Sequence, residues 1–254
     1  MRILSIDPSL GTQVAVVDTA ETAGLPGTCS VQVLSQAEQA DTRRHAESLG
    51  QMLSEALSAP GVADRPLDAV VAATGPAPFT GLRAGLVTAR VVGRTRGIPV
   101  PGVSSLDAVA RLALDELGAR QGEKDPVVLV ATDARRREVY AALFRANGPD
   151  DVTHLTEISV CPPAQVAECI AVQTPEQGSG AVTIDAVAGS GAALYPELAE
   201  TVSCHEALAP ISGDVLTQVR IALARLERGE ELSTQPLYLR HADVQMPTAR
   251  KRVR

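Results

Sequence analysis

Two segments of the chain, 126 residues apart, repeat one local pattern. In each segment a short apolar, β-branched run ends on an aspartate, Asp7 in the first and Asp133 in the second, and a turn then leads into another apolar run. Apolar runs joined by such a tight connection are typical of β-hairpins. Because the two hairpins lie about half a chain apart, they predict a duplicated architecture of two related lobes.

The segments between and after these hairpins alternate between helical and strand patterns. Helices are expected at 41–59, 80–96, 104–118, 162–172 and 212–229, and strands at 69–73, 98–100, 152–160 and 182–188. Such alternation predicts an α/β protein. We place an N-terminal lobe at residues 1–103 and a C-terminal lobe at residues 104–254, and expect the last long helix, 212–229, to pack back on the N-terminal lobe.

The helix expected at 80–96 carries small residues at every fourth position: Gly81, Gly85, Ala89 and Gly93. Residues four apart lie on one face of a helix, so these four form a ridge. A glycine inside a helix costs about 0.5 to 1 kcal/mol relative to alanine, which requires a compensating close neighbour. That neighbour is either the protein's own sheet or a helix of a partner protein. Spacing alone favours internal packing, the commoner arrangement.

Composition and motif content exclude several classes of function. The net charge of −7 and a total of only five aromatic residues argue against autonomous nucleic-acid binding. The four cysteines and four histidines are scattered without the spacing of metal ligands, so no metal site is expected. Neither a nucleophile elbow nor a P-loop is present. No uninterrupted apolar run is long enough to span a membrane and no signal peptide precedes the chain, so we expect a cytoplasmic protein.

The two aspartate turns mark the place where a nucleotide cleft would lie. A phosphate-binding hairpin needs glycine directly after its aspartate, so that backbone N–H groups can approach the anion. Here Pro8 follows Asp7 and Ala134 follows Asp133. Residues 189–191 read Gly-Ser-Gly after a strand, but the third glycine of a dinucleotide motif is missing. We therefore expect no cofactor, and at most weak nucleotide binding, at a vestigial cleft composed of Asp7, Ser9, Gly11, Asp133, Gly189 and Gly191.

Several islands of sequence, spread over both halves and the C-terminal region, carry a family signature. They are Met1 to Asp18, Arg43-Arg44-His45, Gly75-Pro76, Phe79-Thr80-Gly81-Leu82-Arg83, Gly97-Ile98-Pro99, Gly102-Val103-Ser104-Ser105-Leu106, Asp133-Ala134-Arg135 and Pro236-Leu237-Tyr238-Leu239-Arg240. In this order they resemble the TsaB family, formerly YeaZ, the dimerisation subunit of the bacterial machinery that makes threonylcarbamoyladenosine in tRNA.

The resemblance implies an actin-like, sugar-kinase-type fold of two duplicated mixed-sheet lobes that has lost catalysis. It implies a catalytic partner subunit, TsaD, with the ATPase TsaE in the same machinery and tRNA reached through the complex. The assembly transfers a threonylcarbamoyl group to N6 of the adenosine next to the anticodon in tRNAs that read codons beginning with A. Residues 104–108 lack the metal-binding histidine pair of the catalytic relative. The alternative is an active actin-like ATPase or kinase, or a homologue of M22-type peptidases.

The family pairs through its first two long helices, which map here to about 42–58 and 80–96. This resemblance favours the partner-helix explanation of the small-residue ridge. In isolation, two copies of the chain are expected to pair through the same helices. The expected interface residues are His45, Leu49, Met52, Leu53, Gly81, Leu82, Gly85, Leu86, Ala89 and Gly93.

Overall fold

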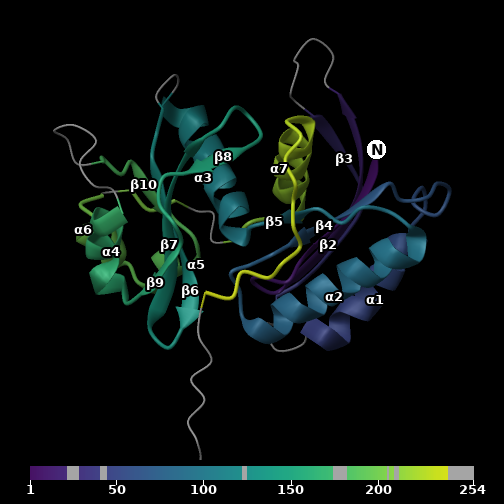
Figure 1. Cartoon of the computed structure of the whole chain (residues 1–254), viewed down its shortest axis with the longest axis horizontal. Coiled ribbons are helices and arrows are strands. Elements are labelled where there is room, and N and C mark those ends of the chain that lie inside the picture. The colour runs from purple at the N-terminus through teal and green to yellow at the C-terminus, as the bar shows by residue number, and fades with distance from the viewer. Residues whose placement is uncertain are drawn as a thin grey trace, which may run out of the picture.

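The computed structural model describes residues 1–21, 29–40, 45–121, 125–173, 182–204, 206–208 and 212–239. It confirms the predicted α/β class: two mixed β-sheets lie side by side, each covered by helices (Figure 1). In the described part of the chain, no helix combines the length and the apolar character needed to cross a membrane.

The first sheet has the strand order β3-β2-β1-β4-β5. Its strands are β1 (Arg2–Asp7), β2 (Thr12–Glu21), β3 (Cys29–Gln39), β4 (Ala69–Ala73) and β5 (Gly102–Val103). β1 pairs antiparallel with β2 and parallel with β4. Both β1 and β4 are buried along their whole length, which explains their nearly continuous apolar sequences.

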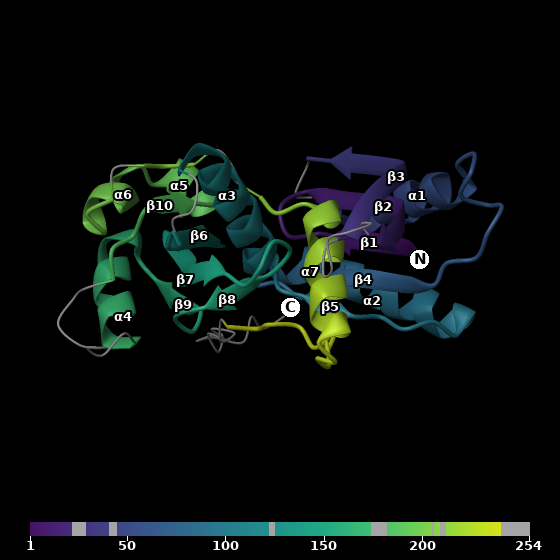
Figure 2. The ribbon, with the colours of Figure 1, turned by 90° about the horizontal axis from the view of Figure 1, so that it is seen from above.

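Helices cover both faces of this sheet (Figure 2). Helices α1 (His45–Ser58) and α2 (Phe79–Arg96) pack on the face that includes Leu4 and Ile6. Helix α7 (Val215–Glu227), from the far end of the sequence, packs on the opposite face, which includes Ile3. The split follows from the strand geometry, because successive side chains point to opposite faces.

The second sheet has the order β10-β6-β7-β8, with β9 also paired to β7. Its strands are β6 (Val128–Arg135), β7 (Glu138–Ala146), β8 (Val152–His154), β9 (Ser159–Cys161) and β10 (Ala186–Ala188). Helix α3 (Ser105–Gln121) packs on one face. The other face is covered by the 3₁₀-helix η1 (Pro163–Gln165) and the helices α4 (Val166–Gln173), α5 (Ser190–Leu194) and α6 (Glu197–Thr201).

The predicted pair of aspartate hairpins is confirmed. β1 and β2 form one antiparallel hairpin and β6 and β7 form the other. The two turns are closed in the same way: the N–H of Ser9 donates to Asp7 Oδ1 at 2.7 Å, and the N–H of Arg135 donates to Asp133 Oδ1 at 2.8 Å. Each aspartate thus caps its own turn, a common role of this side chain.

Several predicted strand boundaries were wrong. Residues 98–100 do not form the expected strand; β5 begins later, at Gly102. Pro99 and Pro101 have no N–H to donate, so they only accept hydrogen bonds, from the N–H groups of Val70 and Ala72. The expected strand 152–160 is two short strands, β8 and β9, and the strand expected at 182–188 covers only its last residues as β10. β3 was not predicted; it is an edge strand with many exposed polar residues.

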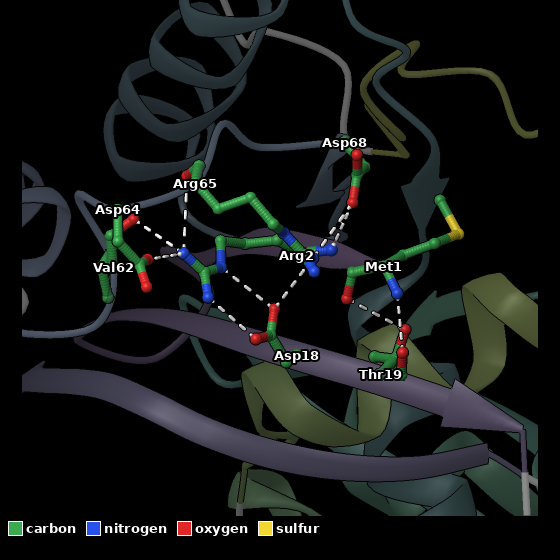
Figure 3. Close-up of polar contacts among 8 residues, drawn as sticks. All are labelled: Met1, Arg2, Asp18, Thr19, Val62, Asp64, Arg65 and Asp68. Carbon is green, nitrogen blue, oxygen red and sulfur yellow. Dashed lines mark hydrogen bonds and ion pairs between the residues drawn. The ribbon is translucent and has the colours of Figure 1, made fainter.

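A polar cluster fixes the start of β1 (Figure 3). The Arg2 side chain is 5% exposed, and its guanidinium contacts Asp18 on β2 at 2.9 Å and Asp64 in the loop before β4 at 2.5 Å. The Arg2 N–H also donates to Asp68 Oδ2 at 2.6 Å. These contacts satisfy a buried cation and join β1 to its two neighbouring segments.

A second ionic network joins α7 to the second sheet. Arg225 on α7 contacts the buried carboxylate of Asp107 on α3 at 2.8 Å and that of Asp151, just before β8, at 2.9 Å. His154 Nε2 lies 2.8 Å from the other oxygen of Asp107. Burial alone would raise the pKa of Asp107, but the hydrogen bond to His154 and the charge of Arg225 outweigh it and lower the pKa. Because α7 packs on the first sheet, this network fixes the two sheets relative to each other.

Candidate functional sites: the cleft between the sheets and the helix pair

A small cavity lies between the two sheets, at the mouths of the aspartate hairpins. It encloses about 30 Å³, room for one or two water molecules. Ligand pockets for nucleotide-sized molecules occupy roughly 300 to 1,000 Å³. The residues that line it are Ser9, Leu10, Pro76, Ala77, Pro78, Ser105, Val109, Thr132, Asp133, Arg135, Ser190, Ser212 and Gly213.

Asp7 does not line this cavity. It is only 2% exposed, and Gln218 of α7 covers it, donating from Nε2 to Asp7 Oδ2 at 2.6 Å. With Ser9 N–H on the other oxygen, the carboxylate is satisfied entirely within the chain. Burial raises the pKa of Asp7 to about 6, against the opposing effect of its hydrogen bonds. A buried, internally bonded aspartate is not presented to a ligand.

Asp133 and Ser9 do meet at the cavity, as the cleft prediction requires. The Asp133 side chain is 18% exposed and pairs with the guanidinium of Arg135 at 3.3 Å. Ser190 also lines the cavity, and its Oγ accepts a hydrogen bond from the backbone N–H of Asp133 at 3.0 Å. Ser105 also lines the cavity but was not predicted; it is 4% exposed, and its Oγ has no hydrogen-bond partner among the described residues. Its position at the start of α3 was the available signal.

The glycines assigned to the cleft serve internal packing instead. A Cβ on Gly11 would lie 2.6 Å from the Gln39 carbonyl oxygen, and one on Gly189 would lie 2.3 Å from the Ala131 carbonyl oxygen. Gly191 is similarly close to Ala131. None of the three lines the described cavity. Their assignment to the vestigial nucleotide cleft was therefore wrong: they are small because the neighbouring backbone is close.

Among the described residues, no group of three or more His, Cys, Asp or Glu side chains gathers as metal ligands would. The cavity offers hydroxyl groups and one carboxylate already paired with an arginine. This arrangement can hold water, but it provides neither the volume nor the backbone cradle of a triphosphate site.

The small-residue ridge of α2 faces the protein's own interior. A Cβ on Gly85 would lie 2.6 Å from Cγ of Pro8, and one on Gly93 would lie 2.2 Å from Cγ2 of Val100. Gly81 and Ala89 are buried on the same face. The expectation that these four residues form a partner interface was wrong, and the internal-packing explanation is correct. The close neighbours are the turn after β1 and the segment after α2.

The apolar residues assigned to the partner interface are also mostly internal. The four buried ones, Leu49, Met52, Leu82 and Leu86, belong to the core beneath the first sheet, so their assignment to an exposed interface was wrong as well. Leu53 is half-buried against that core. The side chain of His45 lies outside the described residues.

The exposed face of the helix pair has a different composition. Val87 and Val91, one turn apart on α2, are 58% and 55% exposed. α2 carries four arginines and no acidic residue, whereas α1 carries Glu47 and Glu55 and no lysine or arginine. The outer surface of α2 thus combines two exposed valines with basic residues, and the neighbouring α1 carries the acidic ones. The four-residue spacing of the two valines was visible in the sequence, but not its outward direction.

Comparison with known proteins gives a consistent likeness. The family model for TsaD, tRNA N6-adenosine threonylcarbamoyltransferase, matches residues 32–213. TsaB of Escherichia coli, named as a tRNA threonylcarbamoyladenosine biosynthesis protein, is 29% identical over 208 residues, covering 78% of this chain and 82% of that protein. An uncharacterized protein of Mycobacterium tuberculosis is 42% identical over 134 residues, 52% of this chain; the chain spans 58% of the length of that relative.

Solved structures show the same fold. YeaZ of Pseudomonas aeruginosa superimposes with a TM-score of 0.66 at 22% identity, covering 94% of this chain and 99% of that one. A second Pseudomonas aeruginosa structure, described as similar to peptidase YEAZ, gives a TM-score of 0.68 at 24% identity. The expected actin-like fold of two mixed-sheet halves is thereby confirmed.

The packing of the ridge predicts that Gly85→Ala destabilises the protein. The added methyl group meets the rigid ring of Pro8, so we expect a loss of about 1 to 3 kcal/mol in the free energy of unfolding. Gly50→Ala on α1 is the matched control, because its Cβ meets nothing within 4 Å. That variant should gain up to about 1 kcal/mol from helix propensity. Urea denaturation measures both; equal effects would contradict the packing described here.

The burial of Asp7 predicts a pH-dependent stability. Because its folded pKa is raised from 3.8 to about 6, the folded state holds the proton more tightly, so stability falls as pH rises from about 4 to about 6 and stays low above that. Asp7→Asn should therefore be more stable than wild type by about 1 to 3 kcal/mol at pH 7, and equally stable near pH 4. The amide fits if Gln218 reverses, since its Oε1 now lacks a partner among the described residues.

Thermal and urea unfolding across this pH range test the prediction. Asp133→Asn, at the equivalent but more exposed position, serves as the control and should show no comparable gain. A destabilised Asp7→Asn at pH 7 would indicate that the charged carboxylate is needed where it lies.

Proposed function

Because the chain belongs to the family of tRNA N6-adenosine threonylcarbamoyltransferases, as a member of its TsaB (YeaZ) branch, we propose that it is a non-catalytic subunit that docks on a TsaD-type catalytic subunit in the cytoplasm. The family acts in the biosynthesis of threonylcarbamoyladenosine in tRNA. In this proposal, the ATPase TsaE and the tRNA meet the chain within the assembled complex.

The closed cleft is the observation that carries the non-catalytic role. A cavity of about 30 Å³ is too small for a nucleotide. In addition, Gln218 is hydrogen-bonded to Asp7, the aspartate that a ligand would need to reach. Arg225, bound to Asp107 and Asp151, holds the two sheets in this closed arrangement. Opening the cleft would separate the buried carboxylates of Asp107 and Asp151 from the arginine that joins them, which is unfavourable.

The outer face of α1 and α2 supports the docking role. Two exposed valines one turn apart supply apolar area, and the same two helices carry charged residues of both signs. The basic α2 of one copy is complementary in charge to the acidic α1 of a second copy, and the reverse holds as well. The same face therefore also suits pairing of two copies of this chain about a twofold axis. We propose that such a homodimer forms in isolation and gives way to the complex with the catalytic subunit.

Docking through this face predicts the effect of Val87→Asp. A charge placed at the centre of the interface loses its water on association, so we expect the affinity for the TsaD-type subunit to fall roughly tenfold or more, without loss of fold. Val172→Asp on α4 is the matched control, because Val172 is 77% exposed on the far helix layer. Light scattering of the purified mixtures measures association. An unchanged complex with Val87→Asp would exclude this face.

The non-catalytic role predicts that Asp7→Asn leaves tRNA modification intact. With purified TsaD-type subunit, TsaE and the substrate for transfer, the variant should support threonylcarbamoyl transfer within about twofold of wild type, because its carboxylate touches no ligand. The transfer rate and the assembly of the complex are measured on the same samples. A loss of a hundredfold or more in a complex that assembles normally would assign this chain a part in catalysis.

A further inference from the structure

The exposed aromatic side chains of the chain are concentrated at one place. Of the five aromatics in the sequence, Phe144 and Tyr140 are buried and Tyr195 is half-buried. The other two, Phe79 and Tyr238, are 54% and 45% exposed, and their ring centroids lie 5.1 Å apart. The two rings come from opposite ends of the sequence, yet they form a joint exposed surface that folding alone leaves in contact with water.

Two arginines of α2 hold the aromatic pair, and the segment that carries Tyr238, in position. The guanidinium carbon of Arg83 lies 4.1 Å from the centroid of the Phe79 ring, and its Nε donates to the Tyr238 hydroxyl at 3.0 Å. Two turns further along α2, Arg90 donates to the carbonyl oxygen of Thr234 at 2.6 Å. The C-terminal segment, which runs from the end of α7 toward the second half (Figure 1), is thereby held against α2 at Thr234 and Tyr238.

The same segment ends at the second half of the protein. Leu239 packs against the core cluster that the second sheet forms with α3. Across the cavity, Arg135 shares its lining with Pro78, directly before α2. The residue before α2 and the first arginine of the hairpin tip therefore line the same cavity, and Tyr238 lies against Phe79 at the start of α2.

The hairpin tip adds three consecutive arginines. Arg135, Arg136 and Arg137 are all exposed, and all have positive φ angles of 64°, 55° and 62°. This backbone region is unfavourable for residues other than glycine, so the sequence keeps arginine here at a cost in stability. The acidic groups nearest in the hairpin are Asp133, paired with Arg135, and Glu138.

Positive charge continues into the residues beyond Leu239. Residues 240–254 contain five basic residues and one acidic residue, in a chain whose net charge is −7. Near the start of α2, Arg83 adds a cation directly against the rings. Basic side chains beside exposed aromatic rings are the combination that binds RNA, because the cations attract phosphates and the rings contact bases or sugars. A protein partner for an aromatic pair would not require this excess of charge.

We propose that the surface formed by Phe79, Arg83, Arg136, Arg137 and Tyr238 binds tRNA directly. The net charge of −7 argues against nucleic-acid binding by the protein's surface as a whole, but at this place arginines and exposed rings occur together. The choice of tRNA as the RNA rests on the proposed function; the RNA-binding surface itself rests on the charge and the exposed rings. It lies at the start of α2, next to the closed cavity, whereas Val87 and Val91 of the docking face lie further along the helix. One subunit thus offers separate contacts to its protein partner and to the substrate.

The test measures binding of fluorescently labelled tRNA to the full-length chain alone by anisotropy, from about 25 to 200 mM salt. The double variant Arg136→Glu/Arg137→Glu should weaken binding roughly tenfold or more and reduce the slope of log K against log salt by about 1 to 2. Arg94→Glu/Arg96→Glu changes the net charge equally at the other end of α2, where both side chains are exposed, and should retain wild-type affinity within about twofold. Circular dichroism confirms that each variant folds.

Two outcomes would overturn the proposal: no saturable tRNA binding by the wild-type chain at the lowest salt, or equal losses in both double variants. Val87→Asp separates this proposal from the docking role, since it should lose the catalytic subunit but keep tRNA. If Val87→Asp still binds the catalytic subunit while Arg136→Glu/Arg137→Glu alone loses tRNA binding, the RNA-binding proposal holds and the docking proposal fails.

Discussion

The position of α7 determines the rest of the structure. Its apolar side packs on the first sheet through residues such as Val215 and Val219, and its polar side reaches the second half through Arg225. Between these contacts, Gln218 closes over Asp7. A single helix from the end of the chain therefore joins the two sheets, satisfies the carboxylate between them and leaves a cavity with room for little more than water.

This closure supports the proposed non-catalytic role. In a cleft that opens, the aspartates at the two hairpin turns would need water, a cation or a nucleotide to satisfy them. Here Asp7 is bonded to Gln218 and Ser9, and Asp133 to Arg135. These internal partners satisfy both carboxylates without a ligand. The surfaces that we propose for docking and RNA binding lie outside the cleft, on the exposed sides of α2 and of the β6–β7 turn.

The elements that were predicted well are those set by neighbouring residues. The aspartate turns and the helix expected at 80–96, which is α2 at Phe79–Arg96, depend on contacts within a few positions, and both are present. The strand at residues 98–100 failed because two prolines remove the N–H groups a ladder needs. The predicted partner interface was wrong for a different reason. A four-residue spacing defines one face of α2, but it does not specify whether that face points into the protein or out to solvent.

The sequence by itself determined the fold class, the duplicated hairpins and the family to which the chain belongs, because local patterns and ordered sequence islands encode them. Only the tertiary structure decided what the small residues and the aromatics do. Gly85 is small because Pro8 lies against it, and Phe79 meets Tyr238 across nearly the whole chain. Such contacts depend on how distant segments are brought together, which no local spacing specifies.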